Sequence, residues 1–199
     1  MTALRRFGLL APLAALSLSG CGLNSIPTAE ENVNAKWGQV QSEYQRRSDL
    51  IPNLVSTVKG YAKQESTVLI EVTQARAAAG SIKLSADDLS DPAKVKAFND
   101  AQNRVSAAII PLQRLQEAYP DLKSNANFLT LQSQIEGTEN SILVSRKDYN
   151  EAVQAYHTRI RTFPDAIGAK IFYGAKPKSM FEASSGSQAA PKVDFGNNG

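Results

Sequence analysis

The sequence predicts an all-α protein: an antiparallel bundle of three long helices, the first kinked at Pro52, followed by a short C-terminal helix. Three observations lead to this fold class. Apolar residues recur at steps that alternate between four and three, which is the spacing of helices that pack on other helices. Start and stop signals divide the chain into segments of helical length. No stretch shows the apolar–polar alternation of a half-buried strand.

The first helix is expected over residues 30–79. Its apolar face begins at Val33 and keeps the alternation of four and three as far as Ala79, and only Arg47 and Glu65 on it are polar. A sustained repeat of this kind is typical of a heptad seam between helices. We therefore expect this face to be the main packing surface of the chain.

Local signals set the limits of this first helix. Thr28-Ala29-Glu30-Glu31 has the pattern of a capping box, and Gly80 supplies a helix stop. Pro52 removes one backbone hydrogen bond and predicts a kink. A full reversal at Pro52 would reset the phase of the repeat. Because the phase does not change there, we predict one continuous kinked helix.

Two further long helices and one short helix follow. Asp91-Pro92 combines an N-cap with a proline at the first helical position, and it begins a second helix over 92–119. Pro111 lies inside this helix and predicts a second kink. The third helix is expected over 127–161, and Pro164-Asp165 begins the short C-terminal helix.

We divide the chain into a leader (1–20), a lipidated tether (21–29), a helical-bundle domain (30–181) and a disordered tail (182–199). The leader has a basic start and an uncharged run of eleven residues. This pattern is typical of a secretory signal peptide, and the run is too short to span a bilayer. Its paired arginines also allow the twin-arginine route, which Gly8 disfavours. The tail is small, polar and rich in glycine.

Cys21 is the only cysteine, and it follows Leu18-Ser19-Gly20. This stretch resembles the bacterial lipobox, in which small residues precede a thiol that is linked to diacylglycerol and is N-acylated after cleavage. The alternative is an unmodified cysteine in a leader that is cut elsewhere or retained. We expect Cys21 to carry these lipids as the only non-protein groups, with no cofactor, and to tether the chain permanently to a membrane.

The mature chain is almost neutral. The full sequence has a net charge of +3, and removal of the two leader arginines lowers it to +1. Basic and acidic residues are interspersed, so there is no electrostatic footprint for nucleic acid. Gly22 follows the cysteine in place of the aspartate that retains lipoproteins in the inner membrane in enteric-type sorting. We therefore expect a periplasmic location, with the outer membrane favoured over the inner.

Candidate catalytic and metal-binding groups are sparse. His157 is the only histidine, and we expect an ordinary, partly exposed side chain, with a pH-sensitive contact as the alternative. Glu136 and Glu139 lie three apart on one helix face, a spacing that suits acid–base chemistry or a metal, but pairing with arginines is the favoured interpretation. The glycines are isolated and form no phosphate-binding loop. We predict no catalytic residue, no metal site and no enzymatic activity.

Arg47 and Glu65 are charged residues on the apolar face of the first helix. They lie about 27 Å apart along a helix, so they cannot pair with each other. Buried charges need partners, and Glu139, Arg146 and Asp148 of the third helix are the candidates. We predict a buried polar network of these five residues that fixes the register of the helices.

Val33, Trp37, Val40 and Tyr44 form the first part of the apolar face, which we call the N-terminal seam. A first helix of 50 residues would be about 75 Å long and the second about 42 Å, so the second would not reach the seam. We therefore expect the seam to be exposed and to pair with a second copy of the chain or with an envelope partner. In the alternative, the third helix or its C-terminal segment folds back over it.

Four groups of residues form longer motifs: RRSDLIPNLVSTVKGY over 46–61, EAYPDLK over 117–123, Thr138-Glu139-Asn140 with Arg146, Tyr149, Asn150 and Val153, and Phe163-Pro164 with Lys176-Pro177 and Phe181-Glu182-Ala183. With these motifs the chain resembles the LemA family of bacterial proteins over about 30–183. The resemblance implies a helical bundle held on the extracytoplasmic face of a membrane and no established enzymatic activity. Two features depart from the family pattern. A lipobox replaces the transmembrane helix of many members, and His157 stands where asparagine is usual.

Three functions are compatible with these observations. The favoured one is a lipid-anchored scaffold or partner-binding module of the cell envelope. The second is an envelope enzyme, or an accessory subunit of one, that uses the carboxylates of the third helix. The third is a transport or lipid-handling protein, which would need an apolar cavity.

Overall fold

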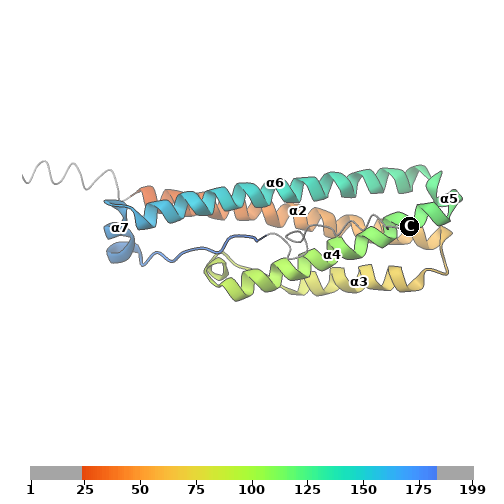
Figure 1. The fold of residues 1–199 in the computed structure, drawn as a ribbon, viewed down its shortest axis with the longest axis horizontal. Coiled ribbons are helices and arrows are strands. Elements are labelled where there is room, and N and C mark those ends of the chain that lie inside the picture. The colour runs from red at the N-terminus through yellow and green to blue at the C-terminus, as the bar shows by residue number, and fades with distance from the viewer. Residues whose placement is uncertain (1–23, 183–199) are drawn as a thin grey trace, which may run out of the picture.

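The computed structural model describes residues 24–182. Two long antiparallel helices, α2 (Ser25–Tyr61) and α6 (Ala126–Arg161), run side by side along the whole molecule (Figure 1). A second antiparallel pair, α3 (Ser66–Ser81) and α4 (Pro92–Ala118), packs beside the half of α2 that ends at Tyr61 (Figure 1). The described residues contain no strand, and the predicted all-α class is confirmed.

Short elements connect and close the long helices. A 3₁₀ turn, η1 (Asp87–Ser90), precedes α4, and α5 (Pro120–Lys123) joins α4 to α6. After α6 come α7 (Asp165–Gly168) and a π-helical turn, η2 (Ala169–Tyr173). An extended segment over 174–182, which we call the C-terminal strap, then returns along the bundle beside α6 (Figure 1).

The expectation of a single first helix over 30–79 is wrong. The helix does pass through Pro52 without reversal, but it ends at Tyr61, and α3 folds back against α2 after a short turn over 62–65. The bundle therefore has four long helices, not three. The turn is four residues long, the same as one step of the apolar repeat, so the spacing of apolar residues carries across the reversal almost unchanged.

A small shift in the apolar face does accompany the reversal. Tyr61, expected inside, is 44% exposed, and its neighbour Ala62 is fully buried in the turn. On α3 the buried residues are Leu69, Val72 and Ala79, so Leu69 replaces the expected Val68 whereas Val72 and Ala79 lie in the predicted phase. The apolar repeat is therefore shifted only around the turn itself, which is too small a change to mark a helix end in the sequence.

The structure confirms the predicted start of α4 but not the predicted start of the first helix. Asp91 caps α4 as predicted, because its side chain accepts hydrogen bonds from the backbone N–H of Ala93 and Lys94 at 2.9 and 3.3 Å. The expected start of the first helix at residue 30 is wrong, since α2 begins at Ser25 and most of the expected tether is helical. Thr28 is therefore inside the helix, where its hydroxyl donates to the Asn24 carbonyl oxygen.

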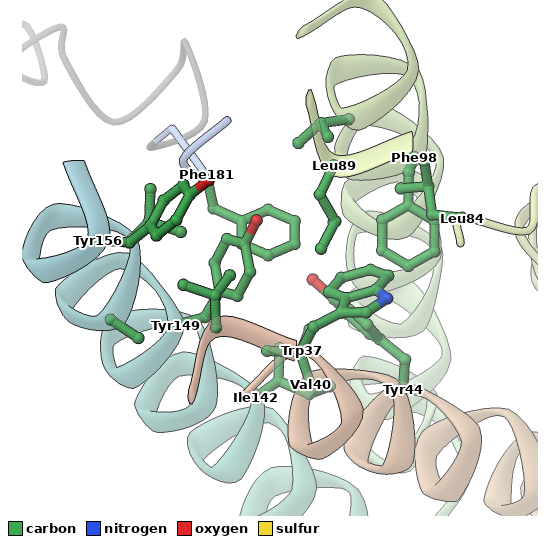
Figure 2. Packing of buried hydrophobic residues seen from close by; sticks show 14 of the residues in the cluster. Trp37, Val40, Tyr44, Leu84, Leu89, Phe98, Ile142, Tyr149, Tyr156 and Phe181 are labelled. Atoms are coloured by element: carbon green, nitrogen blue, oxygen red, sulfur yellow. The ribbon is translucent and has the colours of Figure 1, made fainter. Parts of the chain in front are cut away.

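The expectation of an exposed N-terminal seam is also wrong. Val33, Trp37, Val40 and Tyr44 are all buried. Figure 2 shows Trp37 enclosed by aromatic rings from three directions, with centroid distances of 5.4 Å to Phe98, 6.0 Å to Tyr149 and 6.0 Å to Phe181.

Three elements cover the seam. α6 lies along it for its full length, α4 contributes its first turns, and the C-terminal strap places Phe181 over Trp37. The alternative in which the third helix and its C-terminal segment fold back is therefore the observed arrangement. The length argument fails because α6, not α4, is the helix that reaches the start of α2.

The backbone atoms of the strap make most of the hydrogen bonds that hold it against the bundle. The amide of Asn150 donates to the Phe181 carbonyl, and its oxygen accepts from the Phe181 N–H, both at 2.9 Å. Ser179 donates its N–H to Leu89 in η1 and accepts from the Tyr149 hydroxyl. The strap thus joins η1 to α6 and closes the core around Trp37.

Candidate functional site

Arg47 is the most unusual residue of the interior, because its charged side chain is only 1% exposed. Its Nη1 donates to the Ser106 hydroxyl at 2.6 Å and to the Glu139 carboxylate at 2.9 Å. Its Nη2 donates to the backbone carbonyl and the side-chain oxygen of Gln102, at 3.1 and 2.5 Å. One guanidinium therefore ties α2 to both α4 and α6.

This group separates two apolar clusters. One cluster surrounds Trp37, and the other surrounds Leu54 and the α3–α4 pair. Arg47 lies between Tyr44 of the first cluster and Ile51 of the second, and its guanidinium carbon is 5.1 Å from the Tyr44 ring centroid. A buried cation is tolerated only when its hydrogen bonds are made, so this layer favours one alignment of α2, α4 and α6.

Glu139 is the carboxylate of this group, and its side chain keeps 32% of its surface exposed. It accepts from Arg47 through one oxygen and from the Ser106 hydroxyl through the other, at 3.2 Å. Glu136, its expected partner in acid–base chemistry, instead accepts from the Gln132 side chain one turn away at 3.1 Å. The two carboxylates thus have separate structural partners.

The predicted five-residue network is not a single network. The structure brings Arg47 and Glu139 together, whereas Glu65 lies at the far end of the bundle and accepts from the Tyr119 hydroxyl at 3.1 Å. Arg146 donates to the Glu182 carbonyl, and Asp148 pairs with Lys36 at 3.0 Å. Glu65 is separate because it lies in the turn between α2 and α3, and Arg146 and Asp148 lie about two turns beyond Glu139 along α6. The residues that complete the Arg47 group are Gln102 and Ser106.

A groove between α2 and α3 has a mostly apolar surface. Val55, Leu69 and Ile70 supply its apolar surface, with Thr73 beside them. Lys59 and Lys63 stand on its α2 side. Its volume is about 550 Å³, and Ile70 is 52% exposed although it is a large apolar side chain. The groove exists because α3 folds back on α2, so one continuous helix could not have formed it.

A second cavity of about 430 Å³ opens beside Arg47. Tyr44, Arg47 and Gln102 line its inner part, and Arg76 and Lys83 line it from the α3 side. It is more polar than the groove, because the guanidinium groups and amides contribute to its wall. The hydrogen bonds of Arg47 are directed to protein atoms and not into this cavity.

His157 lies against the C-terminal strap. Its Nε2 accepts a hydrogen bond from the backbone N–H of Lys178 at 3.1 Å. Burial lowers the pKa of His157 below its usual value, and the positive charge of Arg161 lowers it further. The neutral ring therefore helps to hold the strap, a contact of the kind that the alternative interpretation of His157 described.

Lys178, in the strap, has a structural role that the sequence analysis did not predict. It is buried, and its ammonium group donates to Glu30 at 3.0 Å and to the Ala86 carbonyl at 3.2 Å. The strap has no helical period, and its buried residues, Lys178 and Phe181, do not alternate with exposed ones. The one signal in this segment was the pair of short motifs Lys176-Pro177 and Phe181-Glu182-Ala183.

Cys21, the leader and the tail beyond Glu182 lie outside the described residues. Among residues 24–182, no three His, Cys, Asp or Glu side chains gather in an arrangement that could hold a metal ion. Within the same range, no helix combines the length and the hydropathy that crossing a membrane requires.

Two comparisons with known proteins bear on the chain. Residues 36–195 match the model of the LemA family. Protein LemA of Metamycoplasma hominis is 26% identical over 124 residues, which make up 62% of this chain and 52% of the relative. The chain therefore spans about half the length of the curated relative that it matches.

Proposed function

The chain belongs to the LemA family, and from this membership we propose that it is a lipid-tethered binding module of the cell envelope with no catalytic activity of its own. In this proposal Cys21 carries the lipid. The helical domain then lies on the extracytoplasmic face of a membrane, the outer in preference to the inner, and holds a protein partner. No cofactor and no nucleic acid take part.

The observation that carries the partner-binding role is the groove between α2 and α3. Its surface is mostly apolar, with Leu69 and Ile70 of α3 facing Val55 of α2. Apolar surface left in water commonly marks a binding site, and a groove between two helices fits a third helix or an extended segment. The rim lysines, Lys59 and Lys63, favour a segment that carries acidic residues beside its apolar ones.

The position of the groove suits a tethered protein. Ser25 begins α2 only four residues after Cys21, and Lys59 lies near its other end. Along the helix these two residues are about 50 Å apart. A chain held at Cys21 can therefore place the groove up to about 50 Å from the membrane, where a soluble or membrane-anchored partner can approach it.

The roles of the polar residues support a non-catalytic module. The guanidinium of Arg47 directs its hydrogen bonds to protein acceptors, and both oxygens of Glu139 accept from neighbours. The ring of His157 accepts from the strap. A catalytic acid, base or nucleophile must be free to reach a substrate, whereas these groups hold helices and strap in place.

Photo-crosslinking in cells tests the proposal. A benzophenone amino acid placed at Ile70 points from the groove, and the same residue at Leu143 provides a matched exposed apolar position on α6. We expect one discrete crosslinked protein from the Ile70 position and none from Leu143. A groove that gives no adduct, or gives the same adducts as Leu143, would contradict the proposal.

Charge reversal at the groove is the companion measurement. Lys59→Glu with Lys63→Glu should remove the Ile70 adduct, because the rim would then repel an acidic segment. Lys96→Glu with Lys147→Glu is the control, since both lysines are exposed and lie outside the groove. An adduct that survives reversal of the groove lysines would show that they do not select the partner.

A further inference from the structure

The end of the bundle where α2 begins carries a group of exposed apolar side chains. They belong to the loop after α6, to α7 and to η2, and we call them the apolar tip: Phe163, Ile167, Ile171, Phe172 and Tyr173. Ile171 and Phe172 are 68% and 69% exposed. Asp165, Gly168 and Ala169 of the same segment are buried against the bundle, so the large side chains face outward.

The apolar tip is fixed next to the start of α2. The Asp165 carboxylate accepts from the Ser25 hydroxyl at 2.7 Å and pairs with Arg159 of α6 at 3.3 Å. The buried carboxylate thus joins the first residue of α2, the last turns of α6 and α7. Figure 1 shows α7 at the end of the molecule where α2 starts.

Chain length places this end close to the predicted anchor. Three peptide units separate Cys21 from Asn24, the first described residue. Even fully extended, they span about 11 Å. An acylated Cys21 inserts its lipid into the bilayer, so the tip is held within reach of the headgroups whatever path these residues take.

The segment that carries the tip is rich in basic residues. From residue 159 to residue 178 the chain carries Arg159, Arg161, Lys170, Lys176 and Lys178 but only one acid, Asp165. Arg161, Lys170 and Lys176 are exposed, while Arg159 pairs with Asp165 and Lys178 with Glu30. Exposed aromatic and aliphatic side chains bordered by basic residues are the composition of surfaces that lie in the interface of anionic membranes.

We propose that the apolar tip is a membrane-docking site that inserts Ile171 and Phe172 into the headgroup–acyl boundary of the bilayer that holds Cys21. The inference rests on the proposed tether, and it adds an orientation: α2 and α6 stand away from the membrane, with the groove at the outer end. A second anchoring point beside the lipid restricts tilting of the domain, so the groove is presented at a defined height.

Depth-dependent fluorescence quenching tests the docking site. The acylated mature protein carries Ile171→Cys or Leu143→Cys, labelled with NBD, in vesicles of phosphatidylethanolamine and phosphatidylglycerol at about 3:1, a composition chosen to supply anionic headgroups. Leu143, 63% exposed on α6, is the control for an equally apolar position. We expect a lipid-borne nitroxide to quench the label at 171 and aqueous iodide to quench the label at 143. A label at 171 that iodide quenches as strongly as at 143 would overturn the inference.

Other occupants of the tip give a different result. A second copy of the chain, or another segment of it, would shield the 171 label from iodide without exposing it to the lipid nitroxide, and this outcome also overturns the inference. As a second variant, Ile171→Ser with Phe172→Ser should lower nitroxide quenching of a label at Ile167→Cys by about threefold or more. Leu143→Ser with Val144→Ser, at side chains 63% and 60% exposed, should leave it unchanged.

Failure of the tether and failure of the tip can be distinguished. Intact mass shows first whether Cys21 is acylated. If the chain is acylated but the label at residue 171 stays in water, the membrane-docking inference is wrong and the proposed tether is unaffected. If Cys21 is unmodified, the proposed tether fails, and a Cys21→Ser chain labelled only at residue 171 and added to the same vesicles still decides whether the tip inserts.

Discussion

The Arg76 side chain on α3 donates a hydrogen bond from Nε to the Ser48 carbonyl oxygen on α2, at 2.7 Å. In a regular helix that oxygen would accept from the backbone N–H of residue 52, four positions later, but residue 52 is a proline. The hairpin of α2 and α3 thus supplies the donor that Pro52 lacks. This contact helps to explain how α2 continues through a proline.

Arg76→Met should destabilise the protein by about 1–2 kcal/mol, because it leaves the Ser48 carbonyl without a donor in a partly buried position. In the Pro52→Ala background the same change should have a smaller effect, since the alanine N–H can bond Ser48. Urea unfolding of the protein with and without Arg76→Met, in the native and in the Pro52→Ala background, measures this difference in stability loss. Arg104→Met, on the exposed surface of α4, is the control. Equal losses in both backgrounds would contradict the assigned role of Arg76.

Glu139→Gln should lower the free energy of unfolding by about 1–3 kcal/mol, because Arg47 stays buried with less compensation for its charge. Glu136→Gln, one turn away on the exposed face, should change it by less than about 0.5 kcal/mol. The double variant Arg47→Met with Glu139→Gln should lose less free energy of unfolding than the sum of the losses of the two single variants. Additive losses would mean that the pair is not coupled.

Trp37→Ala should destabilise the domain by about 3–5 kcal/mol, since the ring fills the space between α4, α6 and the strap. Leu143→Ala, at an exposed apolar position, should have an effect below about 0.5 kcal/mol. Thermal or urea unfolding, with the oligomeric state checked by light scattering, makes the comparison. Similar small losses at both positions would place Trp37 on a surface, as the sequence had suggested.

Stability should fall as the pH drops from 7 towards 5, in part through His157. The folded state holds the pKa of His157 below its ordinary value of 6.5, so the unfolded chain binds the proton first. Stability is then lost as the pH falls through about 6.5, where the unfolded histidine titrates. Protonation of Nε2 also removes the bond from the Lys178 N–H. Unfolding of His157→Gln should show a smaller pH dependence over this range, and an unchanged dependence would exclude His157 as its source.

The sequence correctly predicted those helix limits that depend on residues close together in the chain. Asp91-Pro92 marks the start of α4 because an aspartate cap and a proline act within one turn. The limits of α6 also agree with the expected 127–161 to within one residue, since its apolar face is long and regular. The α2–α3 reversal was missed because the turn over 62–65 contains neither glycine nor proline and hardly disturbs the repeat.

The candidate site was less predictable, because it depends on contacts between distant segments. Arg47 and Glu139 could be paired from their places on two facing helices, but Gln102 and Ser106 look like ordinary polar residues of α4. The strap carries no periodic pattern, so its cover over Trp37 could not be seen in the sequence. The groove and the Arg76 contact both depend on the reversal after Tyr61, and they were missed with it.

Attachment through Cys21 is the claim on which the location, the orientation and the height of the groove all depend. Intact-mass analysis of the protein extracted from membranes tests it most directly. We expect a chain that begins at Cys21 and carries the added mass of one diacylglyceryl group and one amide-linked acyl chain, with Cys21→Ser released from the membrane fraction. A chain that retains residues 1–20, or a Cys21→Ser variant that stays in the membrane fraction unchanged, would contradict the account.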